Sequence, residues 1–244
     1  MKKAALIFIT LFLSFVTLVS CSGEPPQSYA PNYVDMQTDI AVSYGSAESY
    51  LERDGYGFTV SRLSVTVDGK KAFTDIINAE LEEWLQYGIE TCDTVITEEA
   101  NGDRVYRLVS SVTYSGNGLL SLRCSVDYSE YGETVSRTLK SAVWDVGREE
   151  RVTARMMLKM SDADYENLLT MNLSPIVSER PDAYPKYLVN GAGKYSLYTD
   201  YYINDNGLSL YTLNNNIKYS IEGISFRISF KQLSELFNYD ISTK

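Results

Sequence analysis

Two alternating segments joined by a short polar turn constrain the fold of this chain more than any other feature. In Leu119–Tyr128, every second side chain is suited to a buried face: Leu120, Leu122, Cys124, Val126 and Tyr128. A second such segment, Arg104–Tyr114, comes before it, and the residues SGNG between the two favour a hairpin turn. The sequence therefore predicts a long antiparallel hairpin, and hence a core built around a sheet.

The residues before this hairpin carry the clearest helical pattern. In KKAFTDIINAELEEWLQYG the apolar side chains recur at helical spacing: Phe73, Ile76, Ile77, Leu81, Trp84 and Leu85. We expect this helix to end at Gly88 and Trp84 to lie in the core. The preceding stretch, Gly57–Gly69, is rich in β-branched residues and is predicted as one strand, although its alternation is imperfect.

Further strands and helices follow in an alternating order. Thr134–Val146 is predicted as a third strand, and residues 153–172 as helical, with Ser161 as the N-cap of a second helical piece. The last part predicts a hairpin around an Asn-Gly step, then a strand and a closing helix: Tyr195–Asp205, Gly207–Leu213, Gly223–Phe230 and Lys231–Phe237. This order predicts an α+β fold, with mostly antiparallel sheets and helices packed on one face.

We divide the chain into four parts. Residues 1–20 are predicted to be a signal peptide, and residues 21–56 a tether with an N-terminal arm, since residues 22–31 are polar and rich in proline. Residues 57–150 and 151–244 are predicted to be two closely packed α+β subdomains.

The first residues predict export. Lys2 and Lys3 precede the uncharged, mostly apolar run Ala4–Val19, which is shorter than a membrane span and suits the hydrophobic region of a secretory signal. The residues Leu-Val-Ser before Cys21 resemble the bacterial lipobox, in which a lipid is added to the cysteine thiol and the signal is cut before it. We therefore expect a chain held by lipid at Cys21 on the extracytoplasmic side of the cell membrane. The alternative is an ordinary signal peptide with a cysteine near its end.

The net charge of the chain limits the classes of partner that it can bind. Without Lys2 and Lys3, the 22 basic side chains become 20 against 32 acidic ones, so the net charge is −12. This acidity argues against nucleic acid, whose phosphates need a basic surface, and suits a basic protein partner. Alternatively, the charge only keeps an exported protein soluble.

The sequence contains no histidine, which excludes a Ser-His-Asp or Cys-His catalytic system and any metal site built on imidazole. We expect no cofactor, no metal and no enzymatic activity, with hydrolysis by carboxylates alone as the remaining catalytic alternative. Cys92 and Cys124 are left once Cys21 carries lipid, and they either form a disulfide or stay as two thiols.

The order of these elements resembles the ectodomain of RsiV-type anti-sigma factors, a module that also precedes the catalytic domain of some peptidoglycan deacetylases. The resemblance covers residues 57–237 and is carried by the helix NAELEEWL, the long hairpin and the ending YYINDNGLSLYTLNN…GISFRISFKQL. It implies a binding or sensing module rather than a catalyst, and its anti-sigma members sense lysozyme.

The resemblance also implies where a ligand binds. The family's loop between its last two strands is rich in proline and tyrosine, whereas this chain has no proline there and reads Asn214, Asn215, Asn216, Ile217, Lys218, Tyr219. We expect this loop to contact the ligand, which is a basic protein such as lysozyme. The alternative ligand is peptidoglycan or another glycan, because aromatic faces such as Tyr198, Tyr202 and Tyr211 can stack on sugars, unless they are ordinary strand residues.

Overall fold

The structure is a computed structural model of the chain. It describes the following residues: 39–45, 48–53, 56–96, 104–130, 133–179, 181, 195–197, 199–212, 225–229 and 234–239. The predicted signal peptide and most of the predicted tether lie outside these residues.

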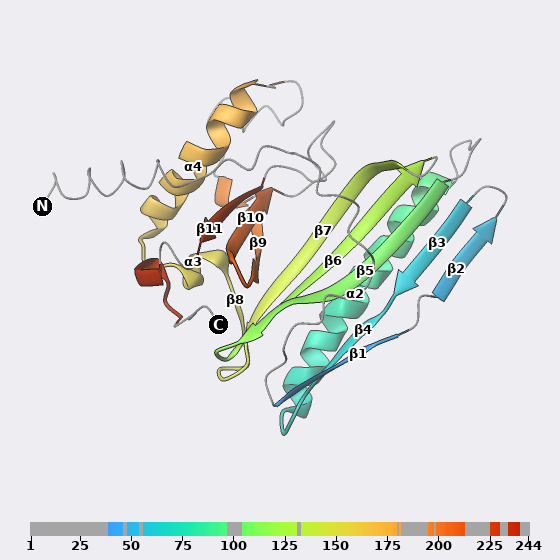
Figure 1. The fold of residues 1–244 in the computed structure, drawn as a ribbon, viewed down its shortest axis with the longest axis horizontal. Coiled ribbons are helices and arrows are strands. Elements are labelled where there is room, and N and C mark those ends of the chain that lie inside the picture. The colour runs from blue at the N-terminus through green and yellow to red at the C-terminus, as the bar shows by residue number, and fades with distance from the viewer. Residues whose placement is uncertain are drawn as a thin grey trace, which may run out of the picture.

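A six-stranded, mostly antiparallel sheet forms the centre of the molecule (Figure 1). Its strands, in spatial order, are β2 (Glu48–Arg53), β3 (Tyr56–Ser61), β5 (Arg104–Gly116), β6 (Leu119–Glu130), β7 (Glu133–Asp145) and β8 (Glu150–Val152). Only β3 and β5 pair in parallel among these neighbours. The fold is α+β, as predicted.

The predicted long hairpin is confirmed as β5 and β6, and the third predicted strand as β7. A two-residue loop joins β5 to β6, with positive φ at both Asn117 (50°) and Gly118 (77°). These angles match the turn type whose twist fits antiparallel strands, and the Asn-Gly pair tolerates them best. The residues SGNG therefore set the register of this long hairpin.

The prediction of a single strand over Gly57–Gly69 is wrong in one respect, because the strand is interrupted at Arg62. Before it, β3 joins the large sheet; after it, β4 (Leu63–Val67) pairs with β1 (Ile40–Tyr44) in a separate two-stranded sheet. Val60 is buried, and so is Leu63, which shifts the buried face by one residue. The imperfect alternation in the sequence marks this change of partner.

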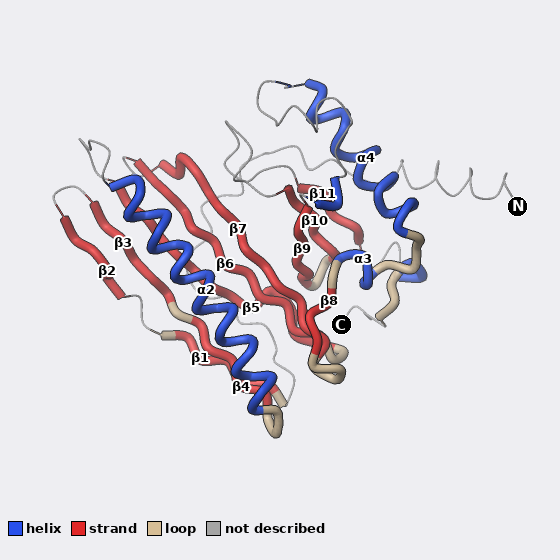
Figure 2. The backbone as a smooth tube through the Cα atoms, turned by 180° about the vertical axis from the view of Figure 1, so that it is seen from behind, coloured by secondary structure: helices blue, strands red, loops and turns tan. Residues whose placement is uncertain are grey.

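Helix α2 (Lys71–Ile96) covers one face of the large sheet, as Figure 2 shows from behind. It buries Phe73, Ile77 and, as predicted, Trp84. Its polar side chains also serve β4: Asn78 bonds to both the N–H and the carbonyl oxygen of Val65, at 2.9 and 2.7 Å. The helix therefore supplies both an apolar face and partners for the open edge of β4.

The predicted end of this helix at Gly88 is wrong, since α2 continues to Ile96. Gly88 is buried, and a Cβ built on it lies 2.3 Å from Leu108 Cδ1 of β5. The glycine therefore lets the helix approach the sheet closely, which is a packing role rather than a stop signal.

A three-stranded antiparallel sheet packs on the other side of the large sheet. It consists of β9 (Thr199–Asn204), β10 (Gly207–Thr212) and β11 (Ser225–Ser229), and the predicted hairpin around Asn204–Gly207 is confirmed. Helices α3 (Ala154–Met157) and α4 (Asp162–Glu179) accompany it, with short 3-10 helices at Tyr195–Leu197 and Ser234–Leu236. The last of these lies within the predicted closing helix.

Strand β9 meets the large sheet with its free edge. Tyr201 accepts a hydrogen bond at its carbonyl oxygen from Ser141 Oγ of β7 (2.5 Å), and Ile203 donates its N–H to Ser121 Oγ of β6 (3.1 Å). The Tyr201 N–H goes to Asp200 Oδ1 (2.8 Å). Side chains therefore supply hydrogen-bond partners for backbone groups on the edge of β9 that does not pair with β10.

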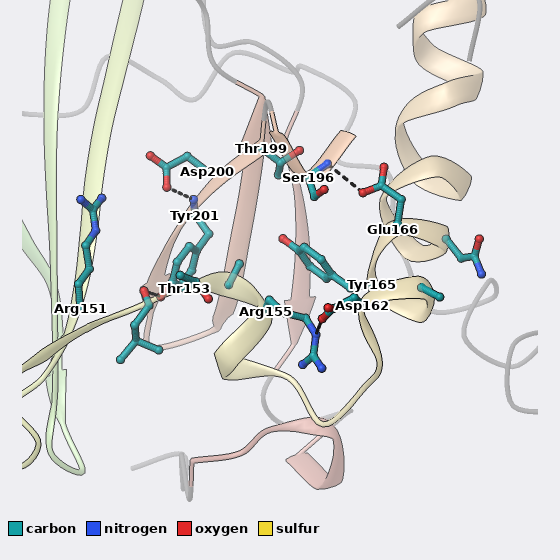
Figure 3. Close-up of a pocket in the computed structure, with 14 residues that line it drawn as sticks. Arg151, Thr153, Arg155, Asp162, Tyr165, Glu166, Ser196, Thr199, Asp200 and Tyr201 are labelled. Carbon is teal, nitrogen blue, oxygen red and sulfur yellow. Dashed lines mark hydrogen bonds and ion pairs between the residues drawn. The ribbon is translucent and has the colours of Figure 1, made fainter. Parts of the chain in front are cut away.

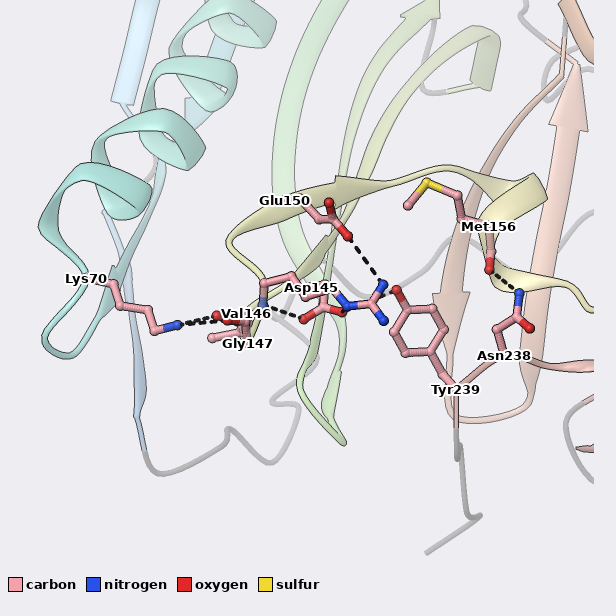
Figure 4. A network of polar contacts seen from close by, with 9 residues as sticks. Lys70, Asp145, Val146, Gly147, Glu150, Met156, Asn238 and Tyr239 are labelled. Atoms are coloured by element: carbon pink, nitrogen blue, oxygen red, sulfur yellow. Dashed lines mark hydrogen bonds and ion pairs between the residues drawn. The ribbon is translucent and has the colours of Figure 1, made fainter.

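The turn between β7 and β8 joins both sides of the molecule (Figure 4). Lys70, at the start of α2, donates to the carbonyl oxygen of Val146 (2.6 Å). On the other side, Tyr239 donates to Asp145 Oδ2 (3.3 Å), and Asn238 donates to a carbonyl oxygen of α3 (2.7 Å). Tyr239 is thus tied to the large sheet and Asn238 to α3.

Two hydrophobic clusters lie on opposite faces of the large sheet, because neighbouring residues of one strand belong to different clusters. Leu120 and Trp144 pack with α2, whereas Leu119 and Val143 pack with α4 and the small sheet. Both predicted subdomains therefore share this sheet. Its last strand, β8, begins at Glu150 and continues past the predicted boundary into the second subdomain.

Candidate ligand pocket

An open pocket lies where β8 and α3 meet the start of α4 and the start of β9 (Figure 3). We call it the β8–α4 pocket, and its volume is about 920 Å³. It is lined by residues from four parts of the chain: 151–155, 162–167 without Asp164, 196 and 199–201. Only the folded chain brings these segments together.

Two helix caps fix the walls of the pocket. Thr153 accepts a hydrogen bond from the Met156 N–H at 3.2 Å and starts α3. Ser161 accepts from the Asp164 N–H at 3.1 Å and donates to the Asp164 carboxylate at 2.6 Å, so the predicted N-cap is confirmed. These reciprocal bonds hold the first turn of α4 in place.

Glu166 connects α4 to the chain segment that leads into β9. Its carboxylate oxygens accept hydrogen bonds from the N–H groups of Tyr195 and Ser196, the second at 3.2 Å. Because both oxygens are bound by backbone groups, Glu166 serves to position the wall of the pocket.

Arg151 lies between the pocket and helix α2. Its guanidinium contacts Glu80 Oε1 at 2.7 Å and donates to the carbonyl oxygen of Ser141 at 2.9 Å. Burial raises the pKa of Glu80 above its usual value, and the charge of Arg151 opposes this rise. Burial likewise raises the pKa of Asp200, while its bond from the Tyr201 N–H and the charge of Arg151 lower it. One arginine therefore stabilises two partly buried acids on different elements.

Tyr165 presents its hydroxyl to the pocket from α4. The side chain is only 6 % exposed, and its oxygen points away from the helix toward β9 (Figure 3). Burial and the nearby charges of Glu166 and Asp200 raise the pKa of Tyr165, so the phenol stays protonated. No residue in the described ranges forms a hydrogen bond with this hydroxyl.

None of the predicted site residues is among the described residues that line this pocket. Cys21 and the loop residues Asn214, Asn215, Asn216 and Tyr219 lie outside the described residues. Cys92 falls in the last turns of α2, where the structure does not describe side chains, whereas Cys124 is a buried free thiol. The structure thus holds Cys124 without a disulfide.

Cys124 is expected to resist alkylation in the folded protein. Burial raises the pKa of the Cys124 thiol to about 12, although a hydrogen bond with Ser110 opposes the rise. The reactive thiolate is therefore scarce at pH 8 and also inaccessible. In a Cys92→Ser variant of residues 22–244, iodoacetamide should add no mass in buffer and one adduct in urea. Rapid modification of the native protein would show that this strand is exposed.

The tyrosines considered as sugar-stacking surfaces do not form a row among the described residues. Tyr211 is buried, and Tyr202 packs beneath the guanidinium of Arg123, whose carbon is 5.2 Å from the ring centre. Tyr198 lies outside the described residues. For Tyr211, the reading as an ordinary strand residue is confirmed.

The residues that do line the pocket carry no clear signal in the sequence. Tyr165 looks like any other residue of the predicted helix, and Asp200 lies within a tyrosine-rich strand. A lone acid next to two tyrosines in a partly buried strand is the signal that indicates Asp200.

Within the described ranges there is no group of three or more Cys, Asp or Glu side chains arranged to hold a metal ion. No helix in the part of the chain that the structure describes is long and apolar enough to span a membrane.

Comparison with known proteins gives structural neighbours only. No protein-family model matches the sequence, and no curated protein matches it. A member of the DUF3298 family from Bacteroides fragilis NCTC 9343 is similar to the structure with a TM-score of 0.46 and 11% identity, over 85% of this chain and 96% of that chain. A DUF3298 family protein from Pseudomonas aeruginosa PAO1 gives a TM-score of 0.45 and 11% identity, over 86% of this chain and 97% of that chain.

Proposed function

We propose that this chain is a lipid-anchored binding module on the extracytoplasmic side of a bacterial cell membrane. The proposed anchor is Cys21, supported by Lys2, Lys3 and the apolar run Ala4–Val19 before it. A single acyl chain holds a protein only weakly at a membrane, so stable anchoring here requires the several chains that a lipobox cysteine receives.

The observation that carries the binding function is the β8–α4 pocket. Its volume of about 920 Å³ lies within the range of small-molecule sites. Its walls are fixed by helix caps and by Glu166, so the pocket exists before a ligand arrives. A preformed pocket loses little conformational entropy on binding.

Binding rather than catalysis is part of this proposal. Two of the acids that line the pocket are already engaged: Glu166 by two backbone N–H groups, and Asp162 by Arg155 at 2.6 Å. A carboxylate held in this way is a poor candidate for proton transfer to a substrate. Release of reducing ends from peptidoglycan by the purified chain would overturn this part.

A basic protein such as lysozyme is the second candidate ligand, favoured by the net charge of −12 on the mature chain. Opposite charges raise association rates, and salt screens this attraction. Its contact surface would include the loop Asn214–Tyr219.

The experiment that tests the proposal immobilises the mature chain, residues 22–244, and offers it purified peptidoglycan and, separately, lysozyme. Retention of peptidoglycan at both low and high salt is the expected result. Retention of lysozyme that weakens steeply with salt would support the second candidate instead. A chain that retains neither would overturn the assignment as a binding module for these envelope ligands.

A further inference from the structure

We infer that the β8–α4 pocket binds a neutral saccharide and that the Tyr165 hydroxyl is one of its recognition groups. This inference rests on the proposed function, because it names the ligand class of the same pocket. It follows from asking which polar groups in the pocket already have partners and which do not.

The Tyr165 hydroxyl is the group that most clearly lacks a partner. The residue is 94 % buried, which is the complement of its 6 % exposure. Among the described residues none donates to or accepts from its oxygen, which faces β9 across the pocket (Figure 3). A hydroxyl on the wall of an open pocket is hydrated, so a ligand that covers it must replace its bond to water, and a ligand that cannot do so leaves the hydroxyl unsatisfied at a cost.

The charged groups of the pocket, by contrast, have partners within the protein. Arg151 contacts Glu80, and Arg155 contacts Asp162. The Glu166 carboxylate is held by two N–H groups. Asp200 accepts from the Tyr201 N–H and, at 3.3 Å, from the Tyr211 hydroxyl.

An ionic ligand would therefore compete with partners that the two arginines already have. A phosphate or carboxylate competes with Glu80 and Asp162 for the two arginines, and a cation is repelled by the positive charge of the same arginines. The arrangement thus favours a ligand without a net charge.

The groups that remain free are neutral. They are the Tyr165 phenol, the Ser196 hydroxyl and the Asn167 carboxamide, and the last two form no side-chain hydrogen bond with any residue that the structure describes. Each of these groups can both donate and accept hydrogen bonds. The hydroxyl and acetamido groups of a sugar have the same dual character, so a saccharide can satisfy all three groups without disturbing the ion pairs.

Binding of the tetramer of β-1,4-linked N-acetylglucosamine to residues 22–244, measured by isothermal titration calorimetry, tests this inference. We expect binding whose Kd changes little between about 50 mM and 500 mM salt, since no ion pair forms. Tyr165→Phe removes only the hydroxyl and should raise the Kd about ten-fold, the effect of losing one buried hydrogen bond.

Two further variants make the result specific to the pocket. Tyr202→Phe, on β9 but outside the pocket lining, is the matched control and should leave the Kd unchanged. Ala163→Phe places a bulky side chain on an exposed lining position of α4 and should abolish binding while the melting temperature stays the same.

The outcomes separate this inference from the proposed function. If the tetramer binds but Tyr165→Phe and Ala163→Phe bind equally well, the saccharide site lies elsewhere and the inference fails, although the chain is still a binding module. If the tetramer does not bind at all while immobilised chain retains peptidoglycan, the pocket does not take the sugar strand. If the affinity falls steeply with salt, the ligand is recognised by charge and the inference is wrong.

Discussion

Replacing both Ser121 and Ser141 by alanine is expected to lower the free energy of unfolding by about 4 kcal/mol, the sum of two buried backbone groups left without partners at about 2 kcal/mol each. The two hydroxyls are buried where β9 meets the large sheet. Ser141 donates to the carbonyl oxygen of Tyr201, and Ser121 accepts from the N–H of Ile203. Water cannot replace either hydroxyl without opening the junction between the sheets.

Urea unfolding of residues 22–244 and of each variant measures this loss. Each single variant should lose about half of the total, and the two losses should add, unless opening at one serine also exposes the other. Ser125→Ala is the control, because Ser125 lies on the same face of β6 but is only half-buried. A double variant as stable as the parent would mean that β9 does not depend on these hydroxyls for its edge.

The same serines show which burial a local pattern cannot predict. The alternation in Leu119–Tyr128 correctly predicts one buried face, and it implies that the residues between, which include Ser121 and Asp127, form a polar face. Both are in fact buried, at 0 % and 2 % exposure. Alternation reports only the contrast between the two faces of a strand, so a polar face that another sheet covers cannot be told from a solvated one. The small sheet that covers it is more than 70 residues away along the chain.

The strands and helices of the core are easier to predict from the sequence, because they depend on the local spacing of apolar and polar residues. The long hairpin, β7, α4 with its Ser161 cap and the β9–β10 hairpin all follow from alternation, helical periodicity and turn residues. The errors at Gly88 and Arg62 have a common cause. Gly88 is required by its contact with Leu108 of β5, and the strand ends at Arg62 because the next residues pair with β1 instead of the large sheet. Neither partner can be recognised from the local sequence.

The pocket could not be predicted for a related reason. Its four lining segments are distant in sequence, and its free groups are common residue types: a tyrosine, a serine and an asparagine. What distinguishes them is the absence of a partner among the described residues, which only the folded arrangement reveals. The predicted loop at Asn214–Tyr219 came from the resemblance and stays a prediction, as does lipid attachment at Cys21.

Gly207→Ala is expected to lower the free energy of unfolding by about 3 kcal/mol, the upper range for forcing an extra methyl group into a packed site. Gly207 begins β10 and faces Ser229 of β11. A Cβ built on it lies 2.3 Å from the Ile228 carbonyl oxygen and 3.1 Å from Ser229 Cα. These are backbone atoms, which cannot rotate away as a side chain can, so β11 must move as a unit.

That movement has a predictable location. Displacing β11 breaks its hydrogen bonds to β10 and leaves β9 and the pocket wall in place, so amide exchange in Gly207→Ala should accelerate in Ser225–Ser229 before it does in β9. Ser209→Ala on the same strand is the control: its buried hydroxyl forms no hydrogen bond with the described residues, so its removal should cost nothing. Equal stability of Gly207→Ala and the parent would show that β10 and β11 lie farther apart at Gly207 than the structure places them. Faster exchange in β9 as well would show that the small sheet opens as one unit, and the saccharide affinity of the variant should then fall with it.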